Sequence, residues 1–256
     1  MSKYKGIDVS LFQGTPDFKK VKNGGIDFVM IKASQGRMNG YNKPFTDPRF
    51  QYNIVNADES GLFCGVYHYL CASNEAQVRE EAEYFISTIK PFRWKVRMWA
   101  AVDVEDSTFI TTDKAATTKN VKLFCDLIRE AGFTPMVYAN TYWLNTRFDA
   151  PSGVPIWEAN LSVKEKPGRA AMWQYSFTGR VDGIQGDVDL NTADCIIGDV
   201  NGDGRLDTKD IMQIMRYVAG WSGVSLNETK ADVNKDGYVN TDDVLKLMQH
   251  IAGWKW

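Results

Sequence analysis

In the stretch Met98-Trp99-Ala100-Ala101-Val102-Asp103-Val104-Glu105, a short apolar run ends in two carboxylates. Such a run predicts a buried strand. Residues i and i+2 of a strand point to the same face, about 6.6 Å apart at Cα, so Asp103 and Glu105 are expected to face one small volume. Two carboxylates at so short a distance repel each other, and their pKa values therefore differ. One can stay protonated while the other is ionised, and such a pair can cleave a glycosidic bond. The structural alternative is a strand-end acid that caps a helix or pairs with Lys or Arg.

Strand and helix patterns alternate around this stretch, which is typical of an α/β protein. Expected strands lie at residues 6–10, 28–33, 63–70, 98–105 and 135–139, and expected helices at 17–23, 48–58, 75–89 and 112–131. Three further strands are expected at 156–159, 171–174 and 188–190, with connections too short and too rich in Pro and Gly for helical crossovers. The sequence therefore predicts an irregular β/α barrel of five βα units followed by three strands.

If these strands are parallel, their carboxyl ends form one rim, where barrel enzymes hold their active sites. The charged and hydroxyl residues expected there are Asp8, Asp103, Glu105, Asp189, Lys32 and Ser34. Aromatic and amide residues join them as candidate substrate-binding groups: Tyr67, Tyr69, Tyr138, Trp157, Trp173 and Gln174. Sugars present apolar faces to aromatic rings and hydroxyls to carboxylates and amides, so the rim predicts a carbohydrate groove. Each aromatic residue taken alone is better explained as core, and it is their convergence on the acid-bearing rim that favours a binding site. His68 is expected to point away from the rim as a structural residue.

The C-terminal part contains a duplication with a shift of 33 residues, Asp199 to Asp210 and Asp232 to Asp243. Oxygen-bearing residues stand at positions 1, 3, 5, 9 and 12 of each copy, Gly stands at position 6, and a backbone carbonyl serves at position 7, as in a calcium-binding loop. The predicted ligands of two structural Ca²⁺ ions are Asp199, Asn201, Asp203, Arg205, Asp207 and Asp210, and then Asp232, Asn234, Asp236, Tyr238, Asn240 and Asp243. The alternative, an acidic solvated turn, does not explain two copies in phase.

Each loop is followed by an amphipathic helical pattern that ends in Ala-Gly-Trp, and no helical pattern precedes the first loop. Two such half EF-hands resemble a type I dockerin, from Gly198 to Trp254. The resemblance implies a small all-α calcium-loop module that binds a cohesin domain of a scaffold protein, as in a cellulosome. In that family, loop positions 10 and 11 help to select the cohesin, and here they are Thr208, Lys209, Thr241 and Asp242.

Six motifs occur in order upstream: Lys5 to Gly14, Phe28 to Gly36, Gly65 to Tyr69, Asp103-Val-Glu105, Trp173-Gln-Tyr175 and Val188 to Asn191. Together they resemble glycoside hydrolase family 25, the β-1,4-N-acetylmuramidases or lysozymes of peptidoglycan. The resemblance implies that Glu105 is the general acid. Asp103 would stabilise positive charge or orient the substrate's 2-acetamido group, and Asp8 and Asp189 would hold the network. It implies no cofactor for catalysis.

Composition narrows the class of protein further. The net charge is −2 and 24% of residues are charged, which gives no electrostatic case for nucleic acid or an anionic membrane. No apolar run is long enough for a membrane span, and the start of the chain does not resemble a signal peptide. We expect an extracellular, secreted or scaffold-attached protein whose signal peptide is absent from this chain. Cys64 and Cys125 are expected to be core thiols, and a Cys64–Cys71 disulfide stays open.

The expected organisation is a catalytic barrel at residues 1–192 and a dockerin-like module at 198–256. A peptidoglycan hydrolase attached to a scaffold is the first hypothesis. The alternatives are a phage-type endolysin whose repeat module anchors it to the cell wall, a glycan-binding protein without activity, and a chitinase-like N-acetylglucosaminidase. The products of peptidoglycan digestion distinguish the two hydrolases, because each leaves a different sugar at the new reducing end.

Overall fold

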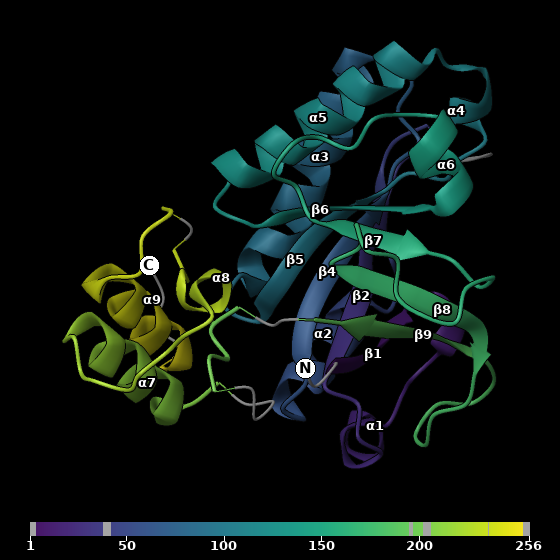
Figure 1. The fold of residues 1–256 in the computed structure, drawn as a ribbon. Coiled ribbons are helices and arrows are strands. Elements are labelled where there is room, and N and C mark those ends of the chain that lie inside the picture. Colours follow the sequence, from purple (N-terminus) through teal and green to yellow (C-terminus); the bar gives the residue numbers. More distant parts are fainter. Residues whose placement is uncertain (1–3, 38–41, 195–196, 202–205, 235, 253–256) are drawn as a thin grey trace. The chain divides into compact units, whose positions relative to one another are not determined.

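The structure is a computed structural model that describes residues 4–37, 42–194, 197–201, 206–234 and 236–252. The chain divides into two compact units, one formed by Lys5–Ala193 and the other by Asp194–Trp256 with the first four residues (Figure 1). No helix within the described ranges is long and apolar enough to cross a membrane.

Within the described residues, the larger unit is built on a nine-stranded sheet, eight strands of which close into a barrel. In chain order the strands are β1 (Tyr4–Val9), β2 (Phe28–Gln35), β3 (Phe45–Thr46), β4 (Phe63–Tyr69), β5 (Val96–Asp103), β6 (Pro135–Asn140), β7 (Ile156–Ala159), β8 (Met172–Gly179) and β9 (Val188–Ala193). Their spatial order is β1-β9-β8-β7-β6-β5-β4-β2-β3, and pairing of β1 with β2 closes the barrel, with the short β3 beside β2. The predicted fold class, an irregular β/α barrel, is confirmed.

Strand alternation divides the side chains between the helices and the barrel interior. Outward residues such as Ile7, Val66 and Val102 belong to the main apolar core, which the helices cover. The helical segments are η1 (Leu11–Gln13), α1 (Phe18–Asn23), α2 (Phe50–Glu59), α3 (Glu75–Ile89), η2 (Lys90–Phe92), α4 (Thr108–Thr111), α5 (Lys114–Glu130) and α6 (Thr141–Thr146). Helices α3 and α5 lie side by side against the sheet (Figure 1). The barrel interior holds polar and aromatic residues together with apolar side chains such as Met30, which lies against Gly65.

One expectation needs correction, because the strands are not all parallel. Strand β9 pairs antiparallel with β8, with Gln174 opposite Asn191. The connection at residues 180–187 is a hairpin link, and a parallel partner would need a crossover of a dozen or more residues. Asp189 therefore stands near the start of its strand rather than at the end. It still reaches the rim, because an antiparallel strand begins where its neighbour ends.

The bare second half of the barrel agrees with the sequence pattern. Residues 147–194, all of which the structure describes, contain no helix. The sequence pattern did not indicate β3, α4 or α6, which are only two, four and six residues long. Segments this short carry too little periodicity to be recognised.

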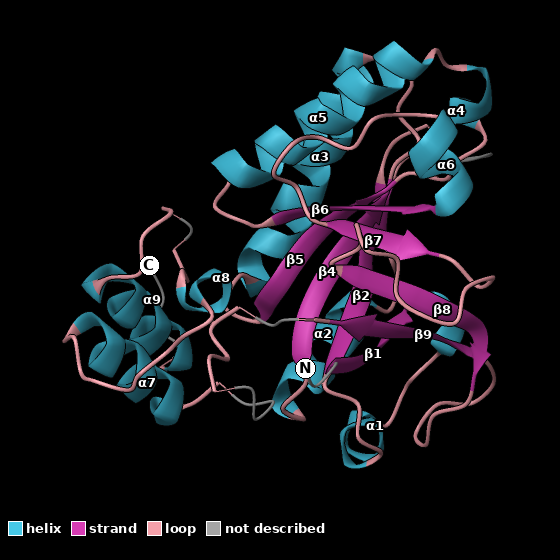
Figure 2. Cartoon of the chain, viewed as in Figure 1, coloured by secondary structure: helices cyan, strands magenta, loops and turns pink. Residues whose placement is uncertain are grey.

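The C-terminal unit is helical in its described residues (Figure 2). It contains α7 (Thr208–Val218), α8 (Glu228–Ala231) and α9 (Thr241–Ile251). Its small core includes Ile211 and Ile214 of α7 and Val244 and Leu247 of α9. The core thus repeats at equivalent positions of the two copies, as the duplication predicted.

Candidate active site and metal loops

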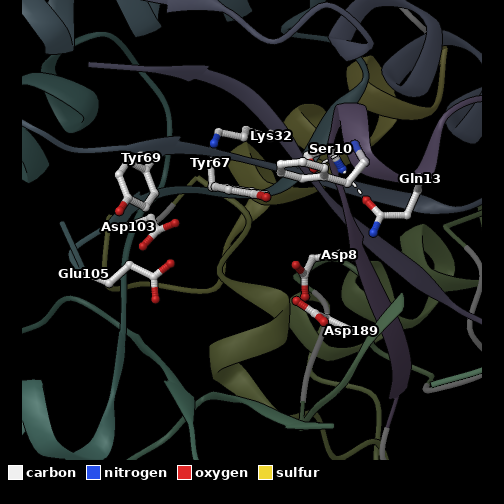
Figure 3. Close-up of a pocket in the computed structure, with 10 residues that line it drawn as sticks. Asp8, Ser10, Gln13, Lys32, Tyr67, Tyr69, Asp103, Glu105 and Asp189 are labelled. Carbon is white, nitrogen blue, oxygen red and sulfur yellow. Dashed lines mark hydrogen bonds between the residues drawn. The ribbon is translucent and has the colours of Figure 1, made fainter. Parts of the chain in front are cut away.

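A pocket of about 270 Å³ opens at the barrel rim. Its lining comes from β1, η1, β2, β4, β5, β9 and the segments that follow them: Asp8, Ser10, Phe12, Gln13, Lys32, Tyr67, Tyr69, Asp103, Glu105 and Asp189. All four predicted catalytic acids are among these residues. They form two pairs on opposite sides of the pocket, Asp103 with Glu105 and Asp8 with Asp189 (Figure 3).

The first pair comes from the end of β5. Asp103 is 5% exposed and the intervening Val104 is fully buried, whereas Glu105 is exposed at the mouth. Burial, and next the Glu105 carboxylate, raises the pKa of Asp103 well above its usual range. Burial and then Asp8 raise the pKa of Glu105, and solvent at the mouth weakens that effect. Close carboxyl groups of this kind share protons as a pair.

The second pair is held by hydrogen bonds. The side-chain amide of Gln174 donates from Nε2 to Asp8 Oδ2 at 2.9 Å and to Asp189 Oδ2 at 3.2 Å. Asn191 Nδ2 donates to the same Asp8 oxygen at 2.8 Å. Asp8 is buried and Asp189 is half-buried. This wall of the pocket is therefore a fixed polar network.

Three predicted substrate-binding residues lie beneath the pocket rather than in its lining. Tyr138 donates its hydroxyl to Gln174 Oε1 at 2.8 Å, and Trp157 donates its indole N–H to Asn191 Oδ1 at 2.8 Å. The Tyr138 and Trp157 rings meet edge to face, with centroids 4.6 Å apart. Tyr138, Trp157 and Gln174 are buried, so they support the acids from below.

Two tyrosines and a lysine line the pocket with the acid pairs, and Tyr69 lies on the side of Asp103 and Glu105 (Figure 3). Tyr67 and Tyr69 are half-buried, and burial raises the pKa of Tyr67 well above its usual range, so its hydroxyl stays protonated. Lys32 Nζ lies 4.9 Å from the centroid of the Tyr69 ring. Burial lowers the pKa of Lys32, and Asp103 is the largest opposing influence. Lys32 is the one cation among the ten residues that line the pocket.

Sequence reasoning missed three lining residues, Ser10, Phe12 and Gln13. Phe12 and Gln13 belong to η1, and Ser10 is its N-cap. Ser10 Oγ accepts from Phe12 N–H, and Gln13 Oε1 accepts from Ser10 N–H. The buried Asp47 carboxylate accepts from the Leu11 N–H at 3.0 Å and ties the turn to the barrel. Phe12 is 81% exposed. The Ser-x-x-Gln capping box directly after a strand was the signal that could have revealed this turn.

Trp173, a fourth predicted substrate-binding residue outside the pocket lining, lies on the outer face of the barrel. Its neighbour Gln174 points into the barrel, so Trp173 alternates to the other face, where its indole donates to the Asn160 carbonyl at 2.7 Å.

His68 also points away from the pocket, as expected. It is fully buried, bonded to Ser34 Oγ at 2.9 Å and Glu81 Oε2 at 3.1 Å. Its ring stacks on Phe124, with centroids 5.3 Å apart. It therefore fastens β4 to the helices.

The three described cysteines, Cys64, Cys71 and Cys125, are buried free thiols. Cys64 and Cys125 belong to the apolar core, as expected. The open Cys64–Cys71 disulfide is not formed. Cys195 lies outside the described residues.

The two predicted calcium loops share one hydrogen-bond pattern around the last ligand position. Asp210 Oδ1 accepts the N–H groups of Val200 and Asn201 at 3.0 and 3.2 Å, and its Oδ2 accepts that of Asp207 at 3.0 Å. Asp243 repeats these bonds with Val233, Asn234 and Asn240 at 2.7, 3.1 and 2.9 Å. Both carboxylates are fully buried. The short arm of Asp at position 12 thus closes each loop onto its helix.

The donor set fits Ca²⁺ by its chemistry. The second loop offers carboxylates, carboxamides and a carbonyl, all hard oxygen donors, at Asp232, Asn234, Asp236, Tyr238, Asn240 and Asp243. Gly237 has φ of +89° and forms the sharp turn at position 6. Asp203 and Arg205 of the first loop lie outside the described residues. Among those described, the loop carboxylates accept backbone N–H bonds, and no group of three or more His, Cys, Asp or Glu is gathered as a metal cluster.

A sequence model of glycosyl hydrolases family 25 matches residues 7–184, the barrel that carries this pocket. The chain belongs to this family. A model of the type I dockerin domain matches residues 197–252. Both families predicted from the motifs are confirmed.

This family 25 chain is similar to named lysozymes. An autolytic lysozyme of Clostridium acetobutylicum is 33% identical over 191 residues, which cover 73% of this chain and 55% of that protein. Lysozyme M1 of Streptomyces globisporus is 29% identical over 216 residues, covering 73% of this chain and 66% of that protein. The chain thus spans just over half of the first relative's length. The crystal structure of a bacterial lysozyme from Streptomyces coelicolor matches with a TM-score of 0.62 at 26% identity, covering 77% of this chain and 94% of that one.

Proposed function

We propose that this protein hydrolyses the β-1,4 bond between N-acetylmuramic acid and N-acetylglucosamine in peptidoglycan. The observation that carries the proposal is the pair Asp103 and Glu105, two carboxyl groups of unequal exposure that face one pocket of a family 25 barrel. The names of the lysozyme relatives support the choice of substrate.

The residues divide the chemistry by exposure. Glu105 is open at the mouth, so it is the carboxyl group of the pair that can reach the bridging sugar oxygen and pass the shared proton to it as the bond breaks. Asp103 is buried beside it, and its Oδ1 has no hydrogen-bond partner among the described atoms. That oxygen is free to accept the N–H of a 2-acetamido group or to face the positive charge that develops on the sugar. Protonation and charge stabilisation come from side chains.

Aromatic rings around the pocket supply the sugar contacts. Tyr67 and Tyr69 line the pocket, and so does the exposed ring of Phe12 in η1. Rings offer flat apolar faces to sugar C–H groups. Phe12 therefore joins Tyr67 and Tyr69 as a substrate-binding residue, and Trp173 is left out of this set.

The lytic proposal is tested with purified cell walls and the full chain. Glu105→Gln should abolish clearing, while Glu130→Gln, a change at an exposed glutamate at the end of α5, should clear as the unmodified protein does. Borohydride reduction of the digest then identifies the cleaved bond. Muramitol supports the muramidase, and glucosaminitol would assign an N-acetylglucosaminidase.

The type I dockerin domain attaches the enzyme to a cohesin domain of an extracellular scaffold. Thr208 and Thr241, at equivalent loop positions, are exposed. Each begins a helix face that continues four and seven residues later into exposed apolar side chains, Met212 and Met215 in α7 and Leu245 and Met248 in α9. Lys209 and Asp242 differ between the copies, so the two faces select partners differently.

Two Ca²⁺ ions hold this module, bound by the loop oxygens from Asp199 to Asp210 and from Asp232 to Asp243. Because ligand binding and folding are coupled, chelation should lower the melting temperature of the module and leave that of the barrel unchanged. Scanning calorimetry of the full chain with and without chelator measures both transitions. A module transition that chelator leaves in place contradicts the calcium assignment.

Capture of the full chain on immobilised cohesin, compared with binding to purified walls, tests the partner. Capture that chelator abolishes supports scaffold attachment. Binding to walls without capture by cohesin would support the alternative, an endolysin anchored to the wall by its repeat module.

A further inference from the structure

Two acids on one wall of the pocket are bridged by a single amide nitrogen. Gln174 Nε2 donates to Asp8 Oδ2 at 2.9 Å and to Asp189 Oδ2 at 3.2 Å. Two carboxyl oxygens that share one donor are close neighbours, and one of these groups is buried. Two negative charges at that separation, away from bulk water, repel strongly.

The hydrogen-bond directions show which acid carries the charge. The indole of Trp157 is donor-only, so the Asn191 carbonyl faces it and the Asn191 amide N–H faces Asp8 Oδ2, at 2.8 Å in each case. On the other side, the Tyr138 hydroxyl donates to Gln174 Oε1 at 2.8 Å, which turns the Gln174 N–H groups toward the acids. Two donor chains therefore converge on one oxygen of Asp8, and charge is stabilised there.

We propose that Asp8 and Asp189 share a single proton, with Asp8 ionised and Asp189 held neutral as an O–H donor at the pocket wall. Asp189 lines the pocket and is half-buried, and its O–H donates to the Asp8 carboxylate, which Gln174 and Asn191 enclose from the other side. Asn191, which no motif had singled out as a site residue, is the positioning residue that fixes this polarity.

Electrostatics of the surrounding elements agree with this arrangement. Burial, and then Asp8, raise the pKa of Asp189 to about 8. Burial also raises the pKa of Asp8, against which the hydrogen bonds from Asn191, Gln174 and Asp189 act. The titratable groups that face the pair across the pocket and beneath it are Lys32 of β2, Tyr67 and Tyr69 of β4, Asp103 and Glu105 from the end of β5, and Tyr138 of β6. Asp189 thus keeps its proton through neutral pH and loses it as the pH rises past about 8.

The consequence for the reaction rests on the proposed function. A neutral Asp189 donates its one hydrogen bond to Asp8 and presents an uncharged carbonyl oxygen to the sugar chain, whereas an ionised Asp189 would place a second negative charge beside Asp8. The wall then contributes one negative charge instead of two, which leaves the proton of the Asp103–Glu105 pair available on the opposite side.

Substitution by Asn distinguishes the protonation states of Asp8 and Asp189, because the Asn amide mimics a neutral carboxyl group. Asp189→Asn keeps a neutral donor, so kcat/KM should fall by no more than about tenfold. Asp189→Ala removes the donor, and Asp8→Asn moves the charge to the less protected site. Each of these should lose about 100-fold or more. Equal losses in Asp189→Asn and Asp189→Ala would overturn the proposal.

A readout without substrate keeps this test separate from the lytic assignment. In the full chain labelled with ¹³C at Asp carboxyl carbons, one resonance should titrate near pH 8 and disappear in Asp189→Asn. Asp187→Asn, at an exposed aspartate of the same segment, should leave that resonance in place. A spectrum with no Asp carboxyl titrating near pH 8 overturns the shared proton, whatever the activity. If the titration is present but the protein does not digest walls, only the proposed function fails.

Discussion

Both walls of the pocket carry carboxyl groups, but those of one wall have hydrogen-bond partners that those of the other wall lack. We call the first wall, with Asp8 and Asp189, the satisfied wall, and the second, with Asp103 and Glu105, the reactive wall. On one wall, Asp8 accepts donors from Gln174 and Asn191, and those amides are fixed in turn by Tyr138 and Trp157. On the other wall, Asp103 has one oxygen without a partner among the described atoms, and Glu105 is open to solvent. A carboxyl group with all its partners in place holds position, and one without them can react.

The largest effect on activity should come from a substitution on the reactive wall. Glu105→Gln keeps the shape of the side chain and removes the proton, so kcat should fall by about 10³-fold with little change in KM. Initial rates on a soluble peptidoglycan oligosaccharide measure both constants. A loss confined to KM would mean that Glu105 binds substrate and that another group supplies the proton.

For the free energy of unfolding, a substitution on the satisfied wall should have a larger effect than one on the reactive wall. Tyr138→Phe on the satisfied wall leaves the buried Gln174 carbonyl without its donor and should cost about 1–3 kcal/mol in the free energy of unfolding. Tyr69→Phe on the other wall removes a contact to Asp106 of 3.4 Å, which is long for a hydroxyl donor, and should cost less than about 0.5 kcal/mol. Urea unfolding of the two variants provides the comparison. Equal costs would contradict the idea that the two walls differ in satisfaction.

The pH profile tests how Lys32 charges the reactive wall. Lys32 lowers the pKa of both Asp103 and Glu105, against the effect of burial. Lys32→Met removes that cation, so both pKa values rise and both limbs of the kcat profile should move to higher pH, by about half a unit to one unit. Lys19→Met, at an exposed lysine of α1, is the control and should leave the profile in place. A shift toward lower pH would contradict the assignment.

The reactive wall could be predicted from the sequence and the satisfied wall only in part. Asp103 and Glu105 are two residues apart, so strand geometry alone places them together. The contact between Gln174 and Asp8 joins residues 166 positions apart, and it depends on the hairpin that reverses β9. No local pattern encodes such a contact, so Gln174 was predicted to bind substrate although its amide is occupied by the two acids.

Strand alternation also explains what happened to the predicted aromatic residues. Trp173 and Gln174 are neighbours in β8 and cannot both face the barrel interior, a rule that could have removed Trp173 from the prediction. Trp157 does point inward, but it lies under the pocket with 2% of its surface exposed. Depth along a strand depends on the register of its neighbours, which the sequence of β7 does not contain.

The smallest effect should come from Phe12, which lines the pocket from η1. Its ring is exposed and is held by η1 through Ser10, Gln13 and the Leu11–Asp47 bond. Loss of one ring–sugar contact is worth about 1 kcal/mol, so Phe12→Ala should raise KM about fivefold and change kcat little, and Phe12→Trp should retain the KM of the unmodified protein. Phe177→Ala, at an exposed ring of β8 that does not line the pocket, is the matched control. If Phe12→Ala lowers kcat as strongly as KM rises, the ring positions the reacting bond as well as the sugar chain. In that case η1 takes part in catalysis, and the reactive wall includes it.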